Sequence, residues 1–322
     1  MKAAVVYQPG GPEALVVEER EKPELKEGWS LVEILGFGLN HSEIFTRQGL
    51  SPSVTFPRIL GIECVGQIAE TTSDDFQIGQ TVISIMGEMG RDFDGSYAEY
   101  TLLPNSQIYP VESQLPLEQL VALPETYYTA YGALKNLQIK AGDTTLIRGA
   151  ASGVGIAMLR LIKAKFPNNQ VYGSSRSLLK EKELLQKGFD GIIVDQQNTL
   201  QTSRSFDKIL ELIGPASIKD SFSHINEHGI VCSNGQLGGK WYLEEFDPIM
   251  ELKNNSYLTS FYSGIVSQKG IQELLDYVSQ YHVDVRPEKI FSLEQIAEAH
   301  SYLESRSGLG KVIVLNQIVK DS

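Results

Sequence analysis

The segment from Thr144 to Phe166 constrains the fold of this chain more than any other. It contains a short apolar run, a turn of small residues and then apolar residues at helical spacing: Leu146-Ile147, Gly149–Gly155, and Ile156, Leu159 and Ile162. This pattern predicts a buried strand that leads through a tight turn into a helix. The free N–H groups and the positive dipole end of that helix favour a bound phosphate. Gly153 and Gly155 let the backbone approach it closely, so the segment predicts a pyrophosphate site.

A turn of this kind also occurs between ordinary strands and helices, so the surrounding pattern decides its meaning. Strand-like and helix-like runs alternate after it: Val171–Ser174, Leu178–Lys187, Ile192–Val194, Ile209–Leu212 and Ile230–Cys232. Such alternation is typical of a doubly wound parallel sheet, an α/β fold of the Rossmann type. This context favours a dinucleotide at the glycine turn, with contacts from Ala150, Ser152, Gly153, Val154 and Gly155.

The residues that end the second strand indicate which dinucleotide binds. NAD-binding chains place an Asp or a Glu about 20 residues beyond the glycines, on the ribose 2′-hydroxyl. This chain has Ser174, Ser175 and Arg176 there, with Lys180 one turn further on. Because charge-assisted donors bind phosphate strongly, these side chains favour the 2′-phosphate of NADPH. The alternative is that Arg176 and Lys180 merely solvate the start of a helix.

Net charge and cysteine content limit the partners of the chain. The formal net charge is −12, which argues against binding to nucleic acid or to an anionic membrane. No apolar run approaches the ~20 residues that span a bilayer, and the N-terminus lacks the pattern of a signal peptide. The two isolated cysteines, Cys64 and Cys232, are expected to be buried residues of a protein in the reducing cytoplasm.

The chain is long enough for two domains, and its character changes twice. The first part contains strand-like runs between turn signals, which predicts a mostly β domain: Ala3–Tyr7, Leu15–Glu18, Ser30–Leu35, Cys64–Ala69 and Thr81–Ile85. The tail contains two helical runs and a strand, at Ile271–Val278, Leu293–Leu303 and Lys311–Leu315. We expect one domain from residues 1–116 and 263–322, and a dinucleotide-binding domain from residues 117–262.

Four further motifs carry a family resemblance. They are Gly38–Glu43, Leu60–Gly66, Gly87–Tyr100 and Pro124–Tyr131. As an ordered set they resemble the medium-chain dehydrogenase/reductase superfamily, and most of all its zinc-free quinone oxidoreductases. The resemblance implies a GroES-like catalytic domain and a homodimer, in which an edge strand near Tyr257–Phe261 pairs across a two-fold axis.

The resemblance also identifies where a catalytic metal would bind. In the zinc alcohol dehydrogenases of this superfamily, a Cys and a His in the first two of these motifs bind the metal. This chain has Asn40 and Ile62 at those positions, and neither side chain suits zinc. Cys64 is displaced by two residues and His41 lacks a partner, so we expect no metal.

Without a metal, a hydrogen-bond donor is needed for the substrate oxygen that gains charge when hydride arrives. Asn40 is the candidate, because its side-chain NH2 can donate while carrying no charge. The alternative is a turn asparagine that bonds its own backbone, as is common before a helix. Phe45, Tyr128 and Tyr131 are expected near the substrate, and a tyrosine that relatives often carry at Phe45 is missing.

Two charged residues are expected to have structural roles. Glu63 lies in an apolar strand, so a buried carboxylate there would need a partner, and Arg47 or Arg58 is the expected one. Lys311 is expected to be a surface lysine beside the last strand. The alternative for Lys311 is a contact with a cofactor phosphate.

The resemblance implies further cofactor contacts, first at Thr129 in the domain junction. The others follow parallel strands, at whose carboxyl ends open α/β sheets bind ligands, and they are Ile213, Gly214, Asn234, Gly235, Tyr262 and Ser263. Together these features predict a zinc-independent oxidoreductase that transfers hydride from NADPH to quinones or other α,β-unsaturated carbonyls. The alternatives are an enoyl-thioester reductase and a non-catalytic protein that binds or senses NADPH.

Overall fold

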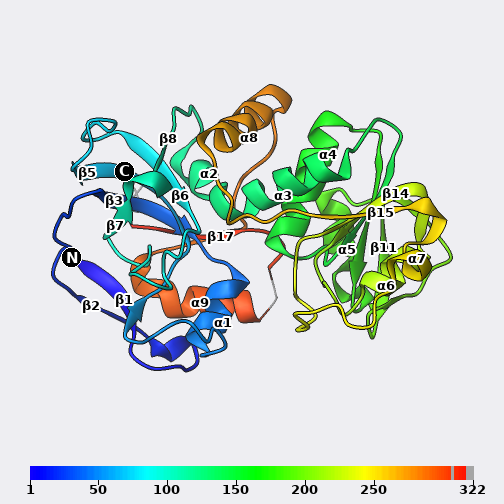
Figure 1. The fold of residues 1–322 in the computed structure, drawn as a ribbon, viewed down its shortest axis with the longest axis horizontal. Helices are drawn as coiled ribbons and strands as arrows, with labels where there is room; N and C mark the ends of the chain where they lie inside the picture. The colour runs from blue at the N-terminus through cyan, green and yellow to red at the C-terminus, as the bar shows by residue number, and fades with distance from the viewer. Residues whose placement is uncertain (306–307, 317–322) are drawn as a thin grey trace. The chain divides into compact units, whose positions relative to one another are not determined.

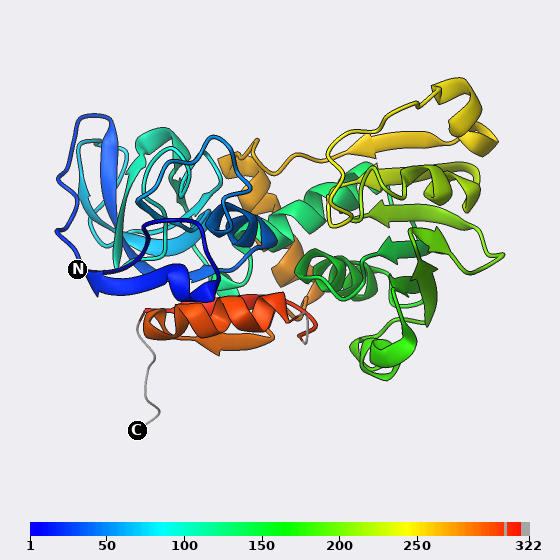
Figure 2. The ribbon, with the colours of Figure 1, turned by 90° about the horizontal axis from the view of Figure 1, so that it is seen from below.

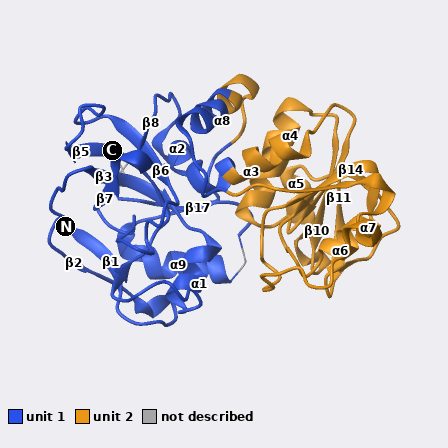
Figure 3. Ribbon diagram, in the orientation of Figure 1, with its two compact units in different colours: residues 1–128, 263–276, 285–322 blue, residues 129–262, 277–284 orange. Residues whose placement is uncertain are grey.

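The computed structural model describes residues 1–305 and 308–316, and the chain forms two compact units (Figure 3). Unit 1 contains residues 1–128, 263–276 and 285–322, and unit 2 contains residues 129–262 and 277–284. A change of unit lies at 262/263, but residues 277–284, expected in the first domain, belong to unit 2. The first boundary lies twelve residues later than expected, after Tyr128 instead of residue 116. The reason is that helix α2 (Leu117–Val121) packs against strands of unit 1, and that the Glu125 N–H binds Glu63.

Unit 1 is mostly β, as expected. Its strands are β1 (Lys2–Val6), β2 (Leu15–Glu19), β3 (Trp29–Gly38), β4 (Arg58–Ile59), β5 (Glu63–Thr71), β6 (Thr81–Ile85), β7 (Tyr100–Pro104), β8 (Tyr109–Pro110), β16 (Lys289–Phe291) and β17 (Val312–Leu315). The larger sheet has the order β16-β17-β3-β5-β6-β8, with β7 also paired to β3, and the smaller has the order β2-β1-β4. Strand β17 pairs antiparallel with β3, which brings the end of the chain into the first domain.

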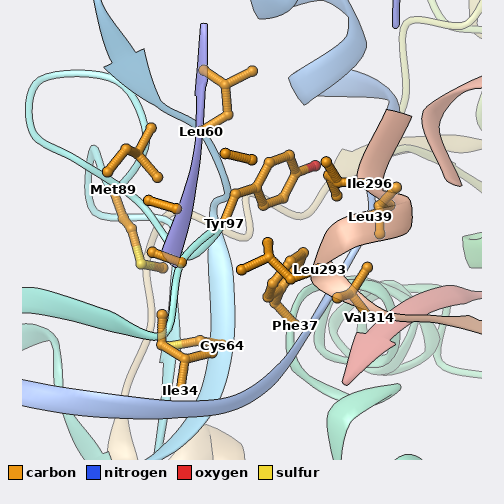
Figure 4. Close-up of a cluster of buried hydrophobic side chains, with 14 of the residues drawn as sticks. Ile34, Phe37, Leu39, Leu60, Cys64, Met89, Tyr97, Leu293, Ile296 and Val314 are labelled. Carbon is orange, nitrogen blue, oxygen red and sulfur yellow. The ribbon is translucent and has the colours of Figure 1, made fainter. Parts of the chain in front are cut away.

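The helices of unit 1 lie beside these sheets. They are α1 (His41–Arg47), α2, the start of α3 (Pro124–Leu137), most of α8 (Gln268–Tyr281) and α9 (Ile296–Glu304). Figure 2 shows α9 in red beside the blue N-terminal strands, and α9 contacts both α1 and β17. Figure 4 shows the apolar core between them, in which Phe37 and Tyr97 stack with ring centroids 4.8 Å apart. Cys64 belongs to this core and is fully buried.

Unit 2 is a doubly wound sheet of the Rossmann type (Figure 1). Its strands are β9 (Thr144–Arg148), β10 (Gln170–Ser175), β11 (Gly191–Gln196), β12 (Thr199–Leu200), β13 (Phe206–Glu211), β14 (Ile225–Ser233) and β15 (Tyr257–Ser260). The order is β12-β11-β10-β9-β13-β14-β15, and all pairs except β11 with β12 are parallel. Its helices include α4 (Gly153–Lys165), α5 (Glu181–Lys187), α6 (Ile218–Ser223) and α7 (Pro248–Glu251). The predicted fold class is therefore confirmed.

Two features of the described residues bear on partners. Strand β15, yellow in Figure 2, forms one edge of the unit 2 sheet. Within residues 1–305 and 308–316, no helix is both long and apolar enough to cross a bilayer.

Candidate functional site

The predicted glycine turn joins β9 to α4 in unit 2. Gly149 has a φ of +87°, which favours glycine. Ser152 caps α4, because its hydroxyl accepts the Gly155 N–H at 3.1 Å and donates to the Gly149 carbonyl at 2.8 Å. A Cβ atom on Gly155 would lie 2.7 Å from that same carbonyl. The turn is therefore a backbone cradle that larger residues would fill, as a pyrophosphate site requires.

The loops after β13 and β14 form the other side of this cradle. Gly214 has a φ of +88°, and a Cβ atom on it would overlap the carbonyl oxygen of Gly235. The Glu211 carboxylate accepts the N–H groups of Ile213 at 2.8 Å and of Gly214 at 3.1 Å. The structure therefore brings three of the predicted contacts together at the carboxyl edge of the sheet.

Asn234 is placed at the same edge, but its side chain already has structural partners. The Asn234 Oδ1 atom accepts from the Cys232 thiol at 2.8 Å, and its Nδ2 donates to the Phe261 carbonyl at 2.9 Å. Asn234 therefore ties β14 to the segment after β15. Burial raises the pKa of Cys232 to about 12, so this thiol stays protonated.

Sequence reasoning missed the buried Arg148, which ends β9 directly before the turn. Its side chain is fully buried and lies 2.8 Å from Asp195, 2.9 Å from Asp220 and 3.7 Å from Glu211. Burial raises the pKa of Glu211, and Arg148 acts in the opposite direction. The available signal was an arginine directly after the apolar run Leu146-Ile147. This cluster fixes the ends of β9, β11 and β13, and with them the loops of the cradle.

The residues expected at a 2′-phosphate divide into two groups. Ser174 is buried, and its hydroxyl accepts the Gly149 N–H at 3.3 Å and donates to Asp195 at 3.4 Å. Its side chain therefore supports the turn from within. Ser175 and Lys180 are partly exposed and Arg176 is exposed, at the end of β10 and in the segment that follows.

The remaining predicted cofactor contacts have different surroundings. Ala150 is fully buried, and Val154 lies in the first turn of α4. Thr129 on α3 is buried, and Tyr262 after β15 is 63% exposed. Ser263 begins the return to unit 1, where its hydroxyl donates to Glu125 at 3.4 Å.

Asn40 lies in a buried polar cluster of unit 1. It begins α1 with a capping box, in which its backbone N–H binds the Glu43 carboxyl at 2.6 Å. Its Nδ2 donates to Glu63 at 2.8 Å, and its Oδ1 accepts from the Lys311 ammonium at 2.8 Å. Asn40 therefore caps α1, and its carboxamide is also held by groups outside the helix.

Lys311 is buried and not a surface residue, so that expectation is wrong. Its ammonium forms an ion pair with the fully buried Glu63 at 2.5 Å. The expected partners of Glu63 are also wrong, because Arg47 binds Glu304 and Arg58 binds Asp94. Sequence reasoning could not find this pair, since β5 and β17 meet their common neighbour β3 only in the folded sheet.

Glu43 lies close to a second buried polar network, which reaches α9. Burial raises the pKa of the Glu43 carboxyl to about 8, although Lys311 lowers it in part. Burial and the nearby Glu43 raise the pKa of the Tyr97 hydroxyl, which lies 3.0 Å from Nε2 of His300. Nδ1 of His300 lies 3.0 Å from Arg47, which can only donate, so the imidazole carries its proton on Nε2. Burial and Arg47 lower the pKa of His300 to about 3, which keeps it neutral.

The three apolar and aromatic candidates lie on two helices, Phe45 on α1 and the two tyrosines on α3. Phe45 is half-buried on α1, which Asn40 caps. The Tyr128 hydroxyl donates to the Ile265 carbonyl at 3.2 Å, so its proton is engaged within unit 1. Tyr131 packs on Tyr277 in unit 2, with ring centroids 5.3 Å apart.

The surroundings of Asn40 offer no familiar metal-ligand set. Ile62 is buried and uses its backbone N–H to bind Glu43 at 3.2 Å. Over the described ranges, no three His, Cys, Asp or Glu side chains are grouped so that they could hold a metal. The ammonium of Lys311 is the cation that this part of the structure places beside Asn40 and Glu63.

Known proteins resemble the chain over its whole length. An alcohol dehydrogenase GroES-like domain matches residues 26–113, and a zinc-binding dehydrogenase domain matches residues 187–314. A quinone oxidoreductase of Pongo abelii is 25% identical over 335 residues, which cover 98% of each chain. The quinone oxidoreductase structure from Coxiella burnetii has a TM-score of 0.82 at 25% identity, over 98% of this chain and 99% of that one. The NADPH complex of mycobacterial Rv1454c shares the fold, with a TM-score of 0.80 at 21% identity over 98% and 99% of the two chains.

Proposed function

The chain belongs to the medium-chain dehydrogenase/reductase superfamily and its quinone oxidoreductase group, and we propose that this oxidoreductase transfers hydride from NADPH to quinones or other α,β-unsaturated carbonyls. The observation that carries the proposal is the position of Asn40. Asn40 begins α1 in the loop where the zinc-dependent relatives carry a metal ligand. Its neutral carboxamide is held by Glu63 and Lys311.

The fold indicates a nicotinamide dinucleotide cofactor, and the residues of unit 2 fit one. The glycine cradle at Gly149 and Gly155 would hold the pyrophosphate, and the loops at Gly214 and Gly235 would line the next part of the site. When bound, the reduced nicotinamide supplies the hydride. Val154, whose N–H lies in the first turn of α4, would bind phosphate through its backbone.

The choice of NADPH rests on the end of β10. Ser175, Arg176 and Lys180 supply hydroxyl and cationic donors with at least partial exposure, and no carboxylate stands in this segment. A bound 2′-phosphate would be held by charge-assisted hydrogen bonds, whereas an unphosphorylated ribose would lose them. Ser174 is better suited to support the turn, since its hydroxyl is directed to Gly149 and Asp195.

Asn40 would act on the acceptor through one hydrogen of its NH2 group. A carbonyl oxygen that gains negative charge is stabilised by a fixed donor, and a neutral amide provides this without a metal. The buried cluster holds the carboxamide in place before substrate arrives, so little reorganisation is needed. Quinol protons would come from solvent, because the Tyr128 hydroxyl is bonded to a carbonyl.

We also propose a cytoplasmic homodimer that pairs through β15. This strand has one free edge in the described sheet, and its Tyr257 and Leu258 side chains are 57% and 39% exposed. An exposed strand edge with apolar side chains favours pairing with a second copy. The two free, buried cysteines fit a reducing compartment.

The experiment is a panel of acceptors mixed with chelator-treated protein and either NADPH or NADH, followed by the loss of absorbance of the reduced cofactor. The panel contains benzoquinones, naphthoquinones, short enones and an enoyl thioester. Fast oxidation of NADPH by quinones or enones, unaffected by chelator, supports the proposal. Oxidation of NADPH by the enoyl thioester alone would favour an enoyl-thioester reductase over a quinone reductase. Binding of NADPH without oxidation by any acceptor, or activity only after zinc is added, would contradict the proposal.

A further inference from the structure

The ammonium of Lys311 lies in a cage of four oxygen atoms. Glu63 Oε1 is 2.5 Å away, Asn40 Oδ1 and Thr126 Oγ1 are each 2.8 Å away, and the Leu39 carbonyl oxygen is 3.3 Å away. The side chain of Lys311 is only 4% exposed and that of Glu63 is 0% exposed. The cage thus encloses a cation that is covalently attached to the chain.

A glycine makes room for this pair. A Cβ atom on Gly38, the last residue of β3, would overlap both the Cε atom of Lys311 and the Oε1 atom of Glu63. The pair therefore occupies the space that a side chain at this position would fill. This is a built arrangement, in which Gly38 ends β3, Glu63 begins β5 and Lys311 directly precedes β17.

The pair also determines the direction of the Asn40 carboxamide. Its carbonyl oxygen faces the ammonium and its amide nitrogen faces the carboxylate. A flipped amide would turn its N–H2 group toward the ammonium and its carbonyl oxygen toward the carboxylate, so both contacts would become repulsive. Glu63 takes one amide hydrogen, and the second remains for another acceptor. Because hydrogen-bonded groups polarise one another, the ammonium on the carbonyl side strengthens the amide as a donor.

We propose that Lys311 and Glu63 are a positioning pair that locks the Asn40 carboxamide with one N–H directed to the substrate oxygen. Lys311 then acts as a tethered cation that selects acceptors whose oxygen becomes anionic during hydride transfer, an inference that rests on the proposed function of Asn40. The pair touches neither acceptor nor cofactor and works only through this amide. The same cage should accept a small free ammonium ion when the lysine side chain is shortened.

The first test is a kinetic comparison of Lys311→Met with Asn40→Ala and with the double variant. We expect Lys311→Met to lower kcat at least about tenfold and to leave the Kd of NADPH unchanged. The loss should stay within the ~100-fold loss of kcat that is typical of removing one such donor. The double variant should be no slower than the slower single variant, since the lysine acts through Asn40. Lys289→Met, on the neighbouring strand β16, is the matched control and should keep wild-type kinetics.

The second test is rescue. In Lys311→Ala, methylammonium or ethylammonium should restore part of kcat with saturation and should raise the thermal midpoint of the cofactor-free protein. Tetramethylammonium, which has no N–H donor, should do neither at the same ionic strength. If the single substitutions impair folding, Glu63→Gln with Lys311→Met leaves no unpaired buried charge and should still be slow.

The outcomes separate this inference from the proposed function. Wild-type turnover in Asn40→Ala would remove Asn40 from the reaction and overturn the proposed function. Slow turnover in Asn40→Ala with wild-type turnover in folded Lys311→Met would overturn the positioning pair alone. The positioning pair would also be overturned if the kcat losses of the two single variants multiplied in the double variant. Equal rescue of Lys311→Ala by tetramethylammonium and by methylammonium or ethylammonium would overturn it as well.

Discussion

Lys311 and Glu63 are 248 positions apart in the sequence and form a buried ion pair at 2.5 Å. The pair links the residue before β17 to the first residue of β5, across β3, and both side chains bind the Asn40 carboxamide. Strand β17 therefore does more than complete the sheet, because the Lys311 ammonium directly before it lies in the candidate active site.

Gly38→Ala should destabilise the protein and lower its turnover. The added methyl group would overlap Lys311 and Glu63, and overpacking of this kind costs about 1–3 kcal/mol of the free energy of unfolding. Denaturant unfolding of the single variant and of Gly38→Ala with Lys311→Ala measures the effect. The extra cost of Gly38→Ala should shrink in the Lys311→Ala background. An equal cost in both backgrounds would mean that the methyl group meets something other than the lysine.

Glu43 should make stability fall as the pH rises. Its pKa is 4.5 in the unfolded chain and about 8 when folded, so between these values the folded state holds a proton that the unfolded state has lost. The free energy of unfolding therefore decreases as pH increases through this interval. His300 acts below pH 6.5 in the opposite direction, because its pKa is lowered on folding.

The measurement for Glu43 is the free energy of unfolding from pH 5 to pH 9, for the wild type and for Glu43→Gln. The difference between the two curves removes the contribution of His300 and should slope downward up to about pH 8. A difference that does not change with pH would show that Glu43 is ionised throughout this range.

Much of the fold follows from local patterns, and the reasons can be seen at particular residues. The strand Thr144–Arg148, the cap at Ser152 and the glycines of the turn lie within one short segment, so their spacing reveals them. Asn40 was found because its motif lies in one loop. Lys311 was misassigned because a lysine beside a strand looks solvated until β17 is placed against β3.

The Arg148 cluster illustrates the same limit in unit 2. Its carboxylates come from the ends of β11 and β13 and from α6, and no spacing in the sequence relates them. For a related reason, the sequence does not show that the Ser174 side chain points inward. Alternation along β10 does not tell which of two adjacent serines turns toward Gly149.

Arg176→Ala combined with Lys180→Ala should weaken NADPH far more than NADH. Loss of hydrogen bonds to a charged phosphate costs about 1.5–3 kcal/mol each, which corresponds to at least a tenfold rise in the Kd of NADPH. Equilibrium binding of both cofactors measures it, with the exposed Lys182→Ala on α5 as the control. An equal loss of affinity for the two cofactors would show that these side chains do not bind the 2′-phosphate.

Tyr257→Glu combined with Leu258→Glu should convert the proposed dimer to a monomer. Both residues lie on β15 and are exposed in the single chain, and like charges would face each other across a two-fold strand pair. Sedimentation measures the mass, and Leu179→Glu, at a side chain that is 92% exposed elsewhere in unit 2, should leave it unchanged. A wild-type chain that is monomeric, or a variant that stays dimeric, would exclude β15 as the interface.

The most direct test of the proposed function is the turnover of Asn40→Ala with NADPH and a benzoquinone, in protein treated with chelator. The account predicts that kcat falls about 100-fold to 1,000-fold, as expected for one lost donor at a developing anion, while the Kd of NADPH stays at the wild-type value. Wild-type turnover in this variant would contradict the account, because the acceptor would then be activated without Asn40.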